Sequence, residues 1–292
     1  GEVRVFIMQI NKIPLDEKGE AYINTYVIED SKQFQTGKIR PAVVICPGGG
    51  YSYIADRESE PVALRYLTHG FHAFVVHYSC GEKALYPKPL VDLAKSMAIV
   101  RKNSEEWHID PDKIVVIGFS AGAHLASMLG TNWNKEWLKK ITGFDPQEIK
   151  PNALILGYGI YDFNEKGDGQ NKNKIREEDA TLYQRIFGTS DPTEEQVEKL
   201  CPIKHISQST PPTFIWHTFM DELVPVGNSL KFAQALNENN VPFELHIFQD
   251  GPHGLSLANE TVERGKDFVN PHVAKWHLLS AEWIKKLFEE KN

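Results

Sequence analysis

One serine of the chain lies between two segments with different secondary-structure preferences. Ser120 stands in the string GFSAG, with Gly118 and Gly122 two places to either side. The run KIVVIGF before it is typical of a strand, and apolar residues at helical spacing follow it, namely Ala121, Leu125, Met128 and Leu129. A strand, a serine and a helix in this order are typical of a nucleophile elbow, whose sharp turn exposes the hydroxyl. We therefore predict that Ser120 is a nucleophile, with a simple helix cap as the alternative.

A serine hydroxyl is a poor nucleophile at neutral pH and needs a nearby general base. His253 lies in the string QDGPHG, directly after the strand-like run FELHIF. Open α/β sheets build their sites in loops at the carboxyl ends of strands, so His253 is the predicted base. His124 falls one helical turn after Ser120, where we expect it to pack, and His217 lies inside an apolar run. The remaining histidines are spaced too loosely to predict a metal site.

The base needs an acceptor that holds its imidazole in one tautomer. Asp221 follows the strand-like run PTFIWHTF and precedes a helical stretch. The chain order Ser120, Asp221, His253 is the Ser–Asp–His order of α/β-hydrolases. Asp221 is therefore the predicted acid, and the alternatives are Glu222 and Asp162.

Attack on a carbonyl also requires backbone N–H groups around the oxygen that becomes negative. The string PGGGY begins at Pro47, directly after the strand-like run PAVVIC, and its three glycines allow the amides to turn inward. No Gly-Lys-Ser/Thr follows, which excludes a phosphate-binding loop. We predict an oxyanion hole formed by the amides of Gly49, Gly50 and Ala121, with a plain turn as the alternative.

The elements that must position these residues alternate along the chain. Strand-like runs begin near residues 41, 72, 113, 152, 212 and 243, and most of them are continuously apolar, as parallel strands covered on both faces are. Helices are predicted between the runs and at the end of the chain, starting near Pro61, Pro89, Pro225 and Pro271. The runs VRVFIMQI and AYINTYVIE predict an antiparallel pair at one edge. The sequence thus predicts one domain over residues 1–292, with the α/β-hydrolase fold: a mostly parallel central sheet with helices on both faces.

Two segments carry more specific expectations. The last helix is expected to bury Val273, Trp276, Trp283 and Leu287. Residues 161–200 are polar and charged and break the alternation of strands and helices. Such a stretch inside a compact domain is usually functional or disordered. We predict a lid-like insertion over one end of the sheet, with flexible surface decoration as the alternative.

Composition narrows the class of protein. The chain has 292 residues, a formal net charge of -7 and no Lys/Arg-dense block, which argues against nucleic acid or a membrane surface as a partner. No apolar run is long enough to cross a membrane. The three cysteines, Cys46, Cys80 and Cys201, are expected to be reduced thiols. The first residues lack the pattern of a signal peptide, so we expect a cytoplasmic protein, unless a leader preceded the glycine at position 1.

Four motifs together resemble acetyl esterases of the α/β-hydrolase superfamily, especially acetyl-xylan esterases and esterases of xylan-utilisation clusters. They are PGGGY, IDPDKIVVIGFSAGAHLA, TPPTFIWHTFMDELVPVGNSLKFAQAL and PFELHIFQDGPHGLSLA, and the resemblance covers nearly the whole chain. Two departures concern the substrate side. Tyr78 is followed by Ser79 where many relatives have arginine, and Pro47 stands where hormone-sensitive-lipase-like relatives have histidine.

The resemblance implies a serine carboxylesterase that removes short acyl groups, in particular acetyl, from xylo-oligosaccharides or other acetylated sugars. It implies Ser120, Asp221 and His253 as the catalytic residues and no metal or cofactor. The expected partner is a small-molecule ester, and a homo-oligomer is compatible with the sequence. Aromatic residues near the predicted loops are candidates for stacking on sugar rings: Tyr51, Tyr53, Trp133 and Tyr161. The alternatives are a serine peptidase of the prolyl-oligopeptidase type and a non-catalytic binding protein with the same fold.

Overall fold

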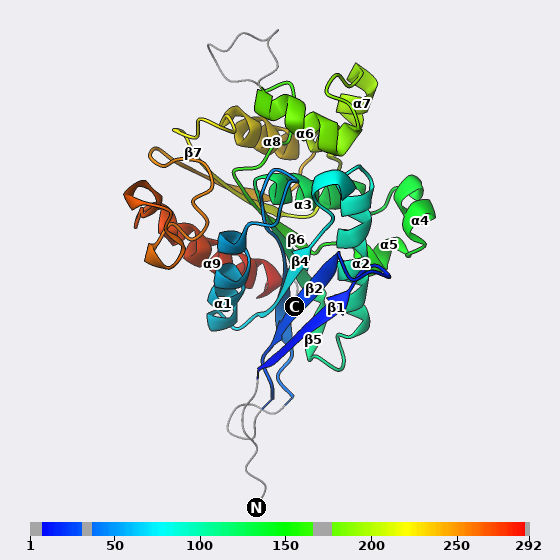
Figure 1. Ribbon diagram of the computed structural model, residues 1–292. Helices are drawn as coiled ribbons and strands as arrows, with labels where there is room; N and C mark the ends of the chain where they lie inside the picture. Colours follow the sequence, from blue (N-terminus) through cyan, green and yellow to red (C-terminus); the bar gives the residue numbers. More distant parts are fainter. Residues whose placement is uncertain (1–7, 31–36, 166–176, 290–292) are drawn as a thin grey trace, which may run out of the picture.

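The computed structural model describes residues 8–30, 37–165 and 177–289. Their strands form one sheet in the order β1-β2-β4-β3-β5-β6-β7-β8, which runs through the centre of the molecule (Figure 1). The strands are β1 (Gln9–Pro14), β2 (Tyr22–Val27), β3 (Arg40–Cys46), β4 (His72–His77), β5 (Ile109–Phe119), β6 (Ala153–Gly157), β7 (Thr213–Thr218) and β8 (Phe243–Phe248).

The six apolar runs predicted from the sequence are β3 to β8, and neighbouring members of this set pair in parallel. β6 and β7 are buried along their whole length. Burial on both faces favours continuously apolar parallel strands, which is why these runs carry no alternation. β5 begins at Ile109, earlier than the predicted start at Lys113. The predicted, mostly parallel central sheet is confirmed.

The N-terminal edge of the sheet is antiparallel. β2 pairs antiparallel with β1 on one side and with β4 on the other. This agrees with the predicted pair at one edge. The first predicted run, residues 3–10, lies mostly outside the described residues, and β1 begins at Gln9.

Helices cover both faces of the sheet. α1 (Glu60–Thr68) and α9 (Trp276–Glu289) pack on one face, and α2 (Lys88–Lys102), α3 (Ala121–Asn132) and α8 (Gly227–Glu238) pack on the other. Figure 1 shows α1 and α9 together, away from α2. The other α-helices of the described residues are α4 (Glu136–Thr142), α5 (Pro146–Ile149), α6 (Glu177–Phe187) and α7 (Glu194–Lys199).

The last helix begins later than predicted. Asn270 accepts hydrogen bonds from the amides of His272 and Val273, and a short 3-10 turn, Val273–Lys275, follows before α9 starts at Trp276. This local capping replaces the first predicted helical turn.

The buried face of α9 also differs in part from the prediction. Trp276 is buried as predicted, but Trp283 is only half-buried. Ile284 and Phe288 are fully buried in place of Trp283 and Leu287. Trp283 and Ile284 are both apolar, and so are Leu287 and Phe288. The spacing of apolar residues therefore does not show which of two adjacent faces of the helix is buried.

The segment predicted as a lid-like insertion contains α6 and α7. Residues 166–176 of this segment lie outside the described residues. The amide of Tyr86 donates to the carbonyl of Ile186, which fixes α6 beside the start of α2. The role of the segment as a lid stays a prediction. Within the described residues, no helix combines the length and apolar character that a membrane crossing needs.

Candidate active site

Ser120 occupies a strained turn between β5 and α3. Its φ is 52° and its ψ is -118°, a conformation that residues other than glycine rarely adopt. The turn requires glycine at position 122, because a Cβ there would lie 1.9 Å from the carbonyl oxygen of Cys46 at the end of β3. The Ser120 amide donates to the carbonyl of Gly157 at the end of β6, at 2.9 Å. Neighbouring strand ends therefore hold the serine at the rim of the sheet, as a nucleophile elbow requires.

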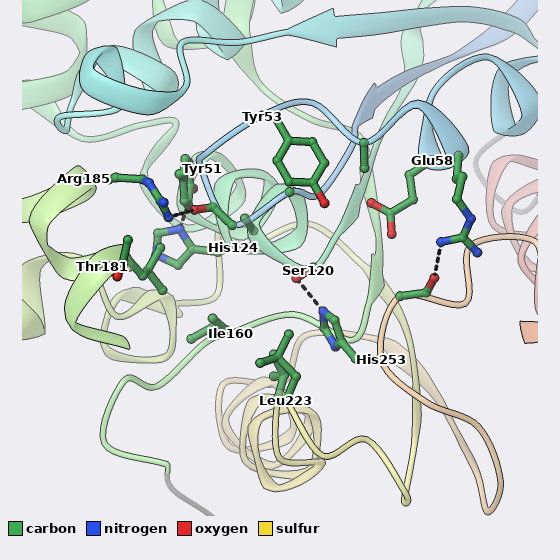
Figure 2. Close-up of a pocket in the computed structure, with 18 of the residues that line it drawn as sticks. Tyr51, Tyr53, Glu58, Ser120, His124, Ile160, Thr181, Arg185, Leu223 and His253 are labelled. Carbon is green, nitrogen blue, oxygen red and sulfur yellow. Dashed lines mark hydrogen bonds between the residues drawn. The ribbon is translucent and has the colours of Figure 1, made fainter. Parts of the chain in front are cut away.

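The structure brings Ser120, His253 and Asp221 together. The Oγ atom of Ser120 lies 2.8 Å from Nε2 of His253, and Nδ1 of His253 lies 2.7 Å from Oδ2 of Asp221 (Figure 2). With Nδ1 protonated, His253 donates to Asp221 and Nε2 is free to accept the serine proton. The three residues come from three strand-end loops, after β5, β7 and β8. The geometry is that of a serine activated by a base that an acid orients.

Asp221 is a buried carboxylate with several donors. Its Oδ1 accepts hydrogen bonds from the amides of Leu223, at 3.0 Å, and Val224, at 2.8 Å. Burial alone would raise the pKa of Asp221, but the hydrogen bonds from His217 and His253 outweigh it and hold the pKa well below its usual value. Asp221 therefore stays ionised beside His253.

Within the described part of the chain, the side-chain partners of His253 are Ser120 and Asp221, not either alternative acid. Asp162 faces Lys231, whose Nζ lies 3.5 Å from Oδ2 of Asp162. Glu222 is exposed, although it is the neighbour of Asp221. Asp221 is buried and faces His253, whereas Glu222 is exposed, and the sequence does not reveal this difference.

His217 is a functional candidate that the sequence reading placed in the strand and gave no role. Its Nε2 lies 3.1 Å from Oδ2 of Asp221 and its Nδ1 lies 2.8 Å from Oγ of Ser229. It is completely buried in β7. The available signal was a histidine four residues before the acid, in the strand that precedes the loop of Asp221.

The glycine loop after β3 lines the same cavity as Ser120. Gly49 has a φ of 121° and Gly50 a φ of 58°, both in the region that favours glycine. The amides of Gly49, Gly50 and Ala121 donate to no backbone acceptor among the described residues. These three predicted amides remain available for an oxyanion. On the far side of the loop, the Arg185 guanidinium donates to the carbonyl of Gly50 at 3.3 Å.

Glu58 is a second residue that the sequence did not reveal. Its Oε2 accepts a hydrogen bond of 2.6 Å from the amide of Gly48, and its Oε1 accepts one of 2.7 Å from the hydroxyl of Tyr158. The Tyr158 hydroxyl in turn accepts from the amide of Ser256, at 2.9 Å. Burial raises the pKa of Glu58, and its two donors oppose that shift. One carboxylate thus connects the glycine loop with the loop that carries His253.

Arg57, the neighbour of Glu58, also holds that loop. Both lie in a short 3-10 helix, η1 (Asp56–Glu58). The Arg57 guanidinium donates to the carbonyl of Gly254 at 2.9 Å and to the carbonyl of Val262. The ring of Tyr158 packs edge-on against His253, with centroids 5.0 Å apart. η1 therefore fixes the distance between the base and the glycine loop.

A cavity of about 470 Å³ opens over Ser120. In Figure 2, Arg185 and Thr181 lie on one side of Ser120, and His253 and Glu58 lie on the other. Thr181, Leu182 and Arg185 come from α6, so part of the predicted insertion lines the cavity.

The predicted stacking residues are only partly at the cavity. Tyr51 lines it, but its ring is buried and its hydroxyl lies 2.8 Å from that of Tyr86 and 2.7 Å from Nδ1 of His124. Tyr53 also lines the cavity and is 59% exposed, with its hydroxyl directed toward Ser120 in Figure 2. His124 packs beneath the turn, as expected.

Two of the predicted stacking residues, Trp133 and Tyr161, are not among the described residues that line the cavity. Trp133 follows the last residue of α3, at the opposite end of the helix from Ser120, and its Nε1 donates to the carbonyl of Ser209. The side chain of Tyr161 is fully buried and packs on Phe232 of α8. Ile160, the neighbour of Tyr161, lines the cavity instead.

The profile of the BD-FAE family matches residues 31–236 of the chain. Endo-1,4-beta-xylanase B of Butyrivibrio fibrisolvens is 32% identical over 76% of this chain, which spans 33% of that protein. The acetylxylan esterase of Xylanibacter ruminicola is 29% identical over 74% of this chain, which spans 41% of that protein. The chain thus covers less than half the length of these two relatives. The crystal structure of an acetyl ester-xyloside bifunctional hydrolase from Caldicellulosiruptor lactoaceticus has a TM-score of 0.77 at 33% identity, over 96% of this chain and 97% of that one.

Proposed function

The chain belongs to the BD-FAE family of α/β-hydrolases, and from that premise we propose that it is a serine carboxylesterase. We propose short acyl esters, in particular acetyl esters of xylo-oligosaccharides or other sugars, as its substrates. The observation that carries the proposal is the contact of 2.8 Å between Oγ of Ser120 and Nε2 of His253, with Asp221 on the other ring nitrogen.

In the proposed first step, His253 takes the proton of the Ser120 hydroxyl while the oxygen attacks the acyl carbonyl. Asp221 stabilises the imidazolium that forms and keeps the ring in place. The carbonyl oxygen becomes negative and accepts hydrogen bonds from the amides of Gly49, Gly50 and Ala121. Each such donor contributes about 3 kcal/mol of transition-state stabilisation in enzymes of this type.

The tetrahedral intermediate then collapses, and the bond between the acyl carbon and the alcohol oxygen breaks. His253 gives its proton to the departing alcohol, which leaves the acyl group on Ser120. Water enters, loses a proton to His253 and attacks the acyl-enzyme through the same oxyanion site. The acid is released, and Ser120 regains its proton.

The cavity and the relatives support a sugar ester as substrate. A volume of about 470 Å³ is within the range of sites that enclose a small ligand. The departing alcohol must lie near Nε2 of His253, so the sugar lies on the side of the loop that follows His253. The acyl group then lies on the side of Thr181 and Leu182. The acetylxylan esterase and the acetyl ester-xyloside hydrolase named above support acetyl and xylose-based groups by analogy.

The proposal is tested by comparing the chain with its Ser120→Ala variant. The substrates are acetylated xylo-oligosaccharides, 4-nitrophenyl acetate, 4-nitrophenyl octanoate and peptide 4-nitroanilides. We expect acetate release from the first two, little hydrolysis of octanoate, none of the peptide amide, and loss of all activity in Ser120→Ala. Cleavage of the amide would support the peptidase alternative. A folded chain that cleaves nothing would support the binding-protein alternative.

A further inference from the structure

The charged side chains that line the cavity are mostly cationic. They are the guanidinium groups of Arg57, Arg185 and Arg264 and the carboxylate of Glu58. The chain as a whole has a formal net charge of -7, so a cavity of this composition is unusual for it. Both oxygens of Glu58 already accept short hydrogen bonds from protein donors. A cavity whose charged groups are mostly cationic favours an anionic ligand.

Two of these arginines lie on the alcohol side of the cavity. Arg57 donates to the carbonyl of Gly254, the residue directly after His253. Arg264 belongs to the same loop, farther along the chain, and lines the cavity together with Gly254. Arg185 lies on the opposite side of Ser120 in Figure 2, and its guanidinium donates to the carbonyl of Gly50. The sugar, rather than the acyl group, therefore faces Arg57 and Arg264.

Arg57 and Arg264 share one aromatic ring. The guanidinium carbon of Arg57 lies 5.1 Å from the centroid of Phe268, and that of Arg264 lies 5.6 Å from it. The ring of Phe268 supports both cations and limits the positions that they can take. Burial lowers the pKa of Arg57, the nearby Tyr158 and Glu58 oppose that shift, and the like charge of Arg264 adds to it. Two cations thus lie at the same ring, and the nearby carboxyl of Glu58 already has a hydrogen-bond donor on each of its oxygens.

Within the described residues, neither Arg57 nor Arg264 has a carboxylate oxygen in ion-pair contact with its guanidinium. Glu263 and Asp267 lie near Arg264 in the sequence, but among the described residues neither of them forms an ion pair with Arg57 or Arg264. The Nη2 atom of Arg57 is buried and has no hydrogen-bond partner in the structure. Arg264 is exposed at the rim, where its remaining N–H groups can reach a ligand.

We propose that Arg264, with Arg57 beneath it, forms a subsite for a carboxylate on the alcohol portion of the ester, so that the enzyme deacylates acidic sugars such as uronic acids. Arg264 contacts the carboxylate, and Arg57 adds to the positive potential from below. The planar guanidinium matches the two oxygens of a carboxylate. This inference rests on the proposed esterase function and adds a substrate class to it.

The test uses two esters that differ only in charge: a monoacetylated methyl glucuronoside and the corresponding acetylated glucuronamide. We expect kcat/KM to be about fivefold higher for the uronate at low ionic strength, the size of effect that a rim ion pair gives. Because the pair is partly exposed, 0.5 M NaCl is expected to reduce the ratio toward one. A second pair, 4-carboxyphenyl acetate and 4-carbamoylphenyl acetate, shows whether the subsite reads the carboxylate on a sugar only or on any alcohol.

Three variants assign the effect to a residue. Arg264→Gln is expected to abolish the preference for the uronate, and Arg264→Lys to retain part of it. Lys266→Gln makes the same change of charge two residues away, at an exposed position that does not line the cavity, and is expected to keep the preference. Circular dichroism checks that each variant folds.

The outcomes separate this inference from the proposed function. Equal rates for the two acetylated sugars in the parent enzyme overturn the subsite but leave the esterase function intact. An unchanged preference in Arg264→Gln, or an equal loss in Lys266→Gln, overturns the assignment to Arg264. If neither sugar ester nor 4-nitrophenyl acetate is hydrolysed, the proposed function itself fails.

Discussion

Oδ2 of Asp221 lies 3.1 Å from Nε2 of His217, so a second imidazole contacts the carboxylate oxygen that faces His253. His217 is completely buried in β7, and its other ring nitrogen lies beside the hydroxyl of Ser229 in α8. The direction of Asp221 is thus fixed by a strand and a helix as well as by its own loop. A carboxylate that is held in this way needs little rearrangement when His253 becomes charged.

We therefore expect that replacing His217 lowers activity, although this buried side chain does not contact the substrate. A hydrogen bond to a charged group is worth about 1.5–3 kcal/mol, so His217→Ala should reduce kcat about ten- to hundredfold with little change in KM. His217→Gln keeps a donor of similar length and should restore part of the loss. The measurement is steady-state hydrolysis of 4-nitrophenyl acetate. His246→Gln, in the neighbouring strand β8, is the control because His246 contacts Glu244 and not Asp221. A loss confined to KM would show that His217 does not act through Asp221.

Asp221 and Glu222 provide a direct comparison of two adjacent acids. In Asp221→Asn the remaining oxygen is expected to keep accepting from the amides of Leu223 and Val224, which places the NH2 group against Nδ1 of His253. An NH2 group there favours the wrong tautomer, so kcat is expected to fall by about 10⁴. Glu222→Gln changes an exposed side chain and should leave kcat within about twofold. Both variants are assayed with the same ester, and thermal unfolding checks that they fold. Similar losses in the two variants would contradict the assignment of Asp221 as the acid.

The order of the strands explains why so much of this site was predictable. Ser120, Asp221 and His253 each follow an apolar run, and parallel strands place their carboxyl ends at one rim of the sheet. Local strings of sequence were therefore enough to predict three residues that meet in space. The fold class needed only the alternation of apolar runs and helical stretches.

Other parts of the site depend on contacts between distant segments. Glu58 becomes important only because Tyr158 and Gly48 lie against it, and no local pattern around Glu58 shows this. Trp133 was misplaced because an aromatic residue near a loop in the sequence can lie at the wrong end of a helix. Tyr161 was predicted at the cavity, but Ile160 lines it and Tyr161 is buried. In an irregular segment the direction of a side chain follows from the backbone and not from the residue type.

Glu58 is expected to position the oxyanion loop. Glu58→Gln replaces one accepting oxygen by an amide that cannot accept, so either Gly48 or Tyr158 loses its partner. Because a buried donor without an acceptor costs about 1–3 kcal/mol, kcat should fall about ten- to hundredfold. Tyr158→Phe removes the link to Ser256 but leaves the bond from Gly48, and it should have the smaller effect.

To separate positioning from stability, kcat and KM are measured for each variant, and urea unfolding of the same variants gives their free energy of unfolding. Glu60→Gln is the control, because Glu60 accepts from Tyr26 and has no contact with the glycine loop. If Glu58→Gln lowers the free energy of unfolding while kcat stays at the parent value, Glu58 serves stability alone.

Gly122 and Gly130 lie in the same helix, α3, but we expect substitution by alanine to change the free energy of unfolding much more at Gly122 than at Gly130. A Cβ on Gly122 would lie 1.9 Å from the backbone oxygen of Cys46, whereas on Gly130 it would meet the flexible end of Leu154 at 2.5 Å. Gly122→Ala must displace a strand end and should cost about 3 kcal/mol or more. In Gly130→Ala the gain in helix propensity offsets the movement of Leu154, so stability should change by only about 1 kcal/mol. Urea unfolding of both variants tests this, and equal losses would disprove the difference.

The pKa of His72 is expected to make the free energy of unfolding depend on pH. It is buried at the start of β4, and its Nδ1 accepts a hydrogen bond of 3.1 Å from the amide of Ile28. Burial first, and the nearby Arg40 second, lowers the pKa of His72 to about 4. The unfolded chain has the ordinary pKa of about 6.5 and therefore binds more protons between pH 4 and 6.5. The free energy of unfolding that His72 contributes is complete above pH 6.5 and decreases as the pH falls through this window, by about 2–3 kcal/mol at pH 4.5.

His72→Asn isolates this contribution. The Asn side-chain oxygen can accept from Ile28 in place of Nδ1, but it does not titrate. The variant should be less stable than the parent at pH 7.5, and the difference should shrink by about 2–3 kcal/mol at pH 4.5, because only the parent gains the proton on unfolding. Urea unfolding at pH 7.5, 6.5, 5.5 and 4.5 gives both curves. Parallel curves over this range would mean that His72 has the same pKa in the folded and unfolded chains, and its burial would then carry no pH dependence.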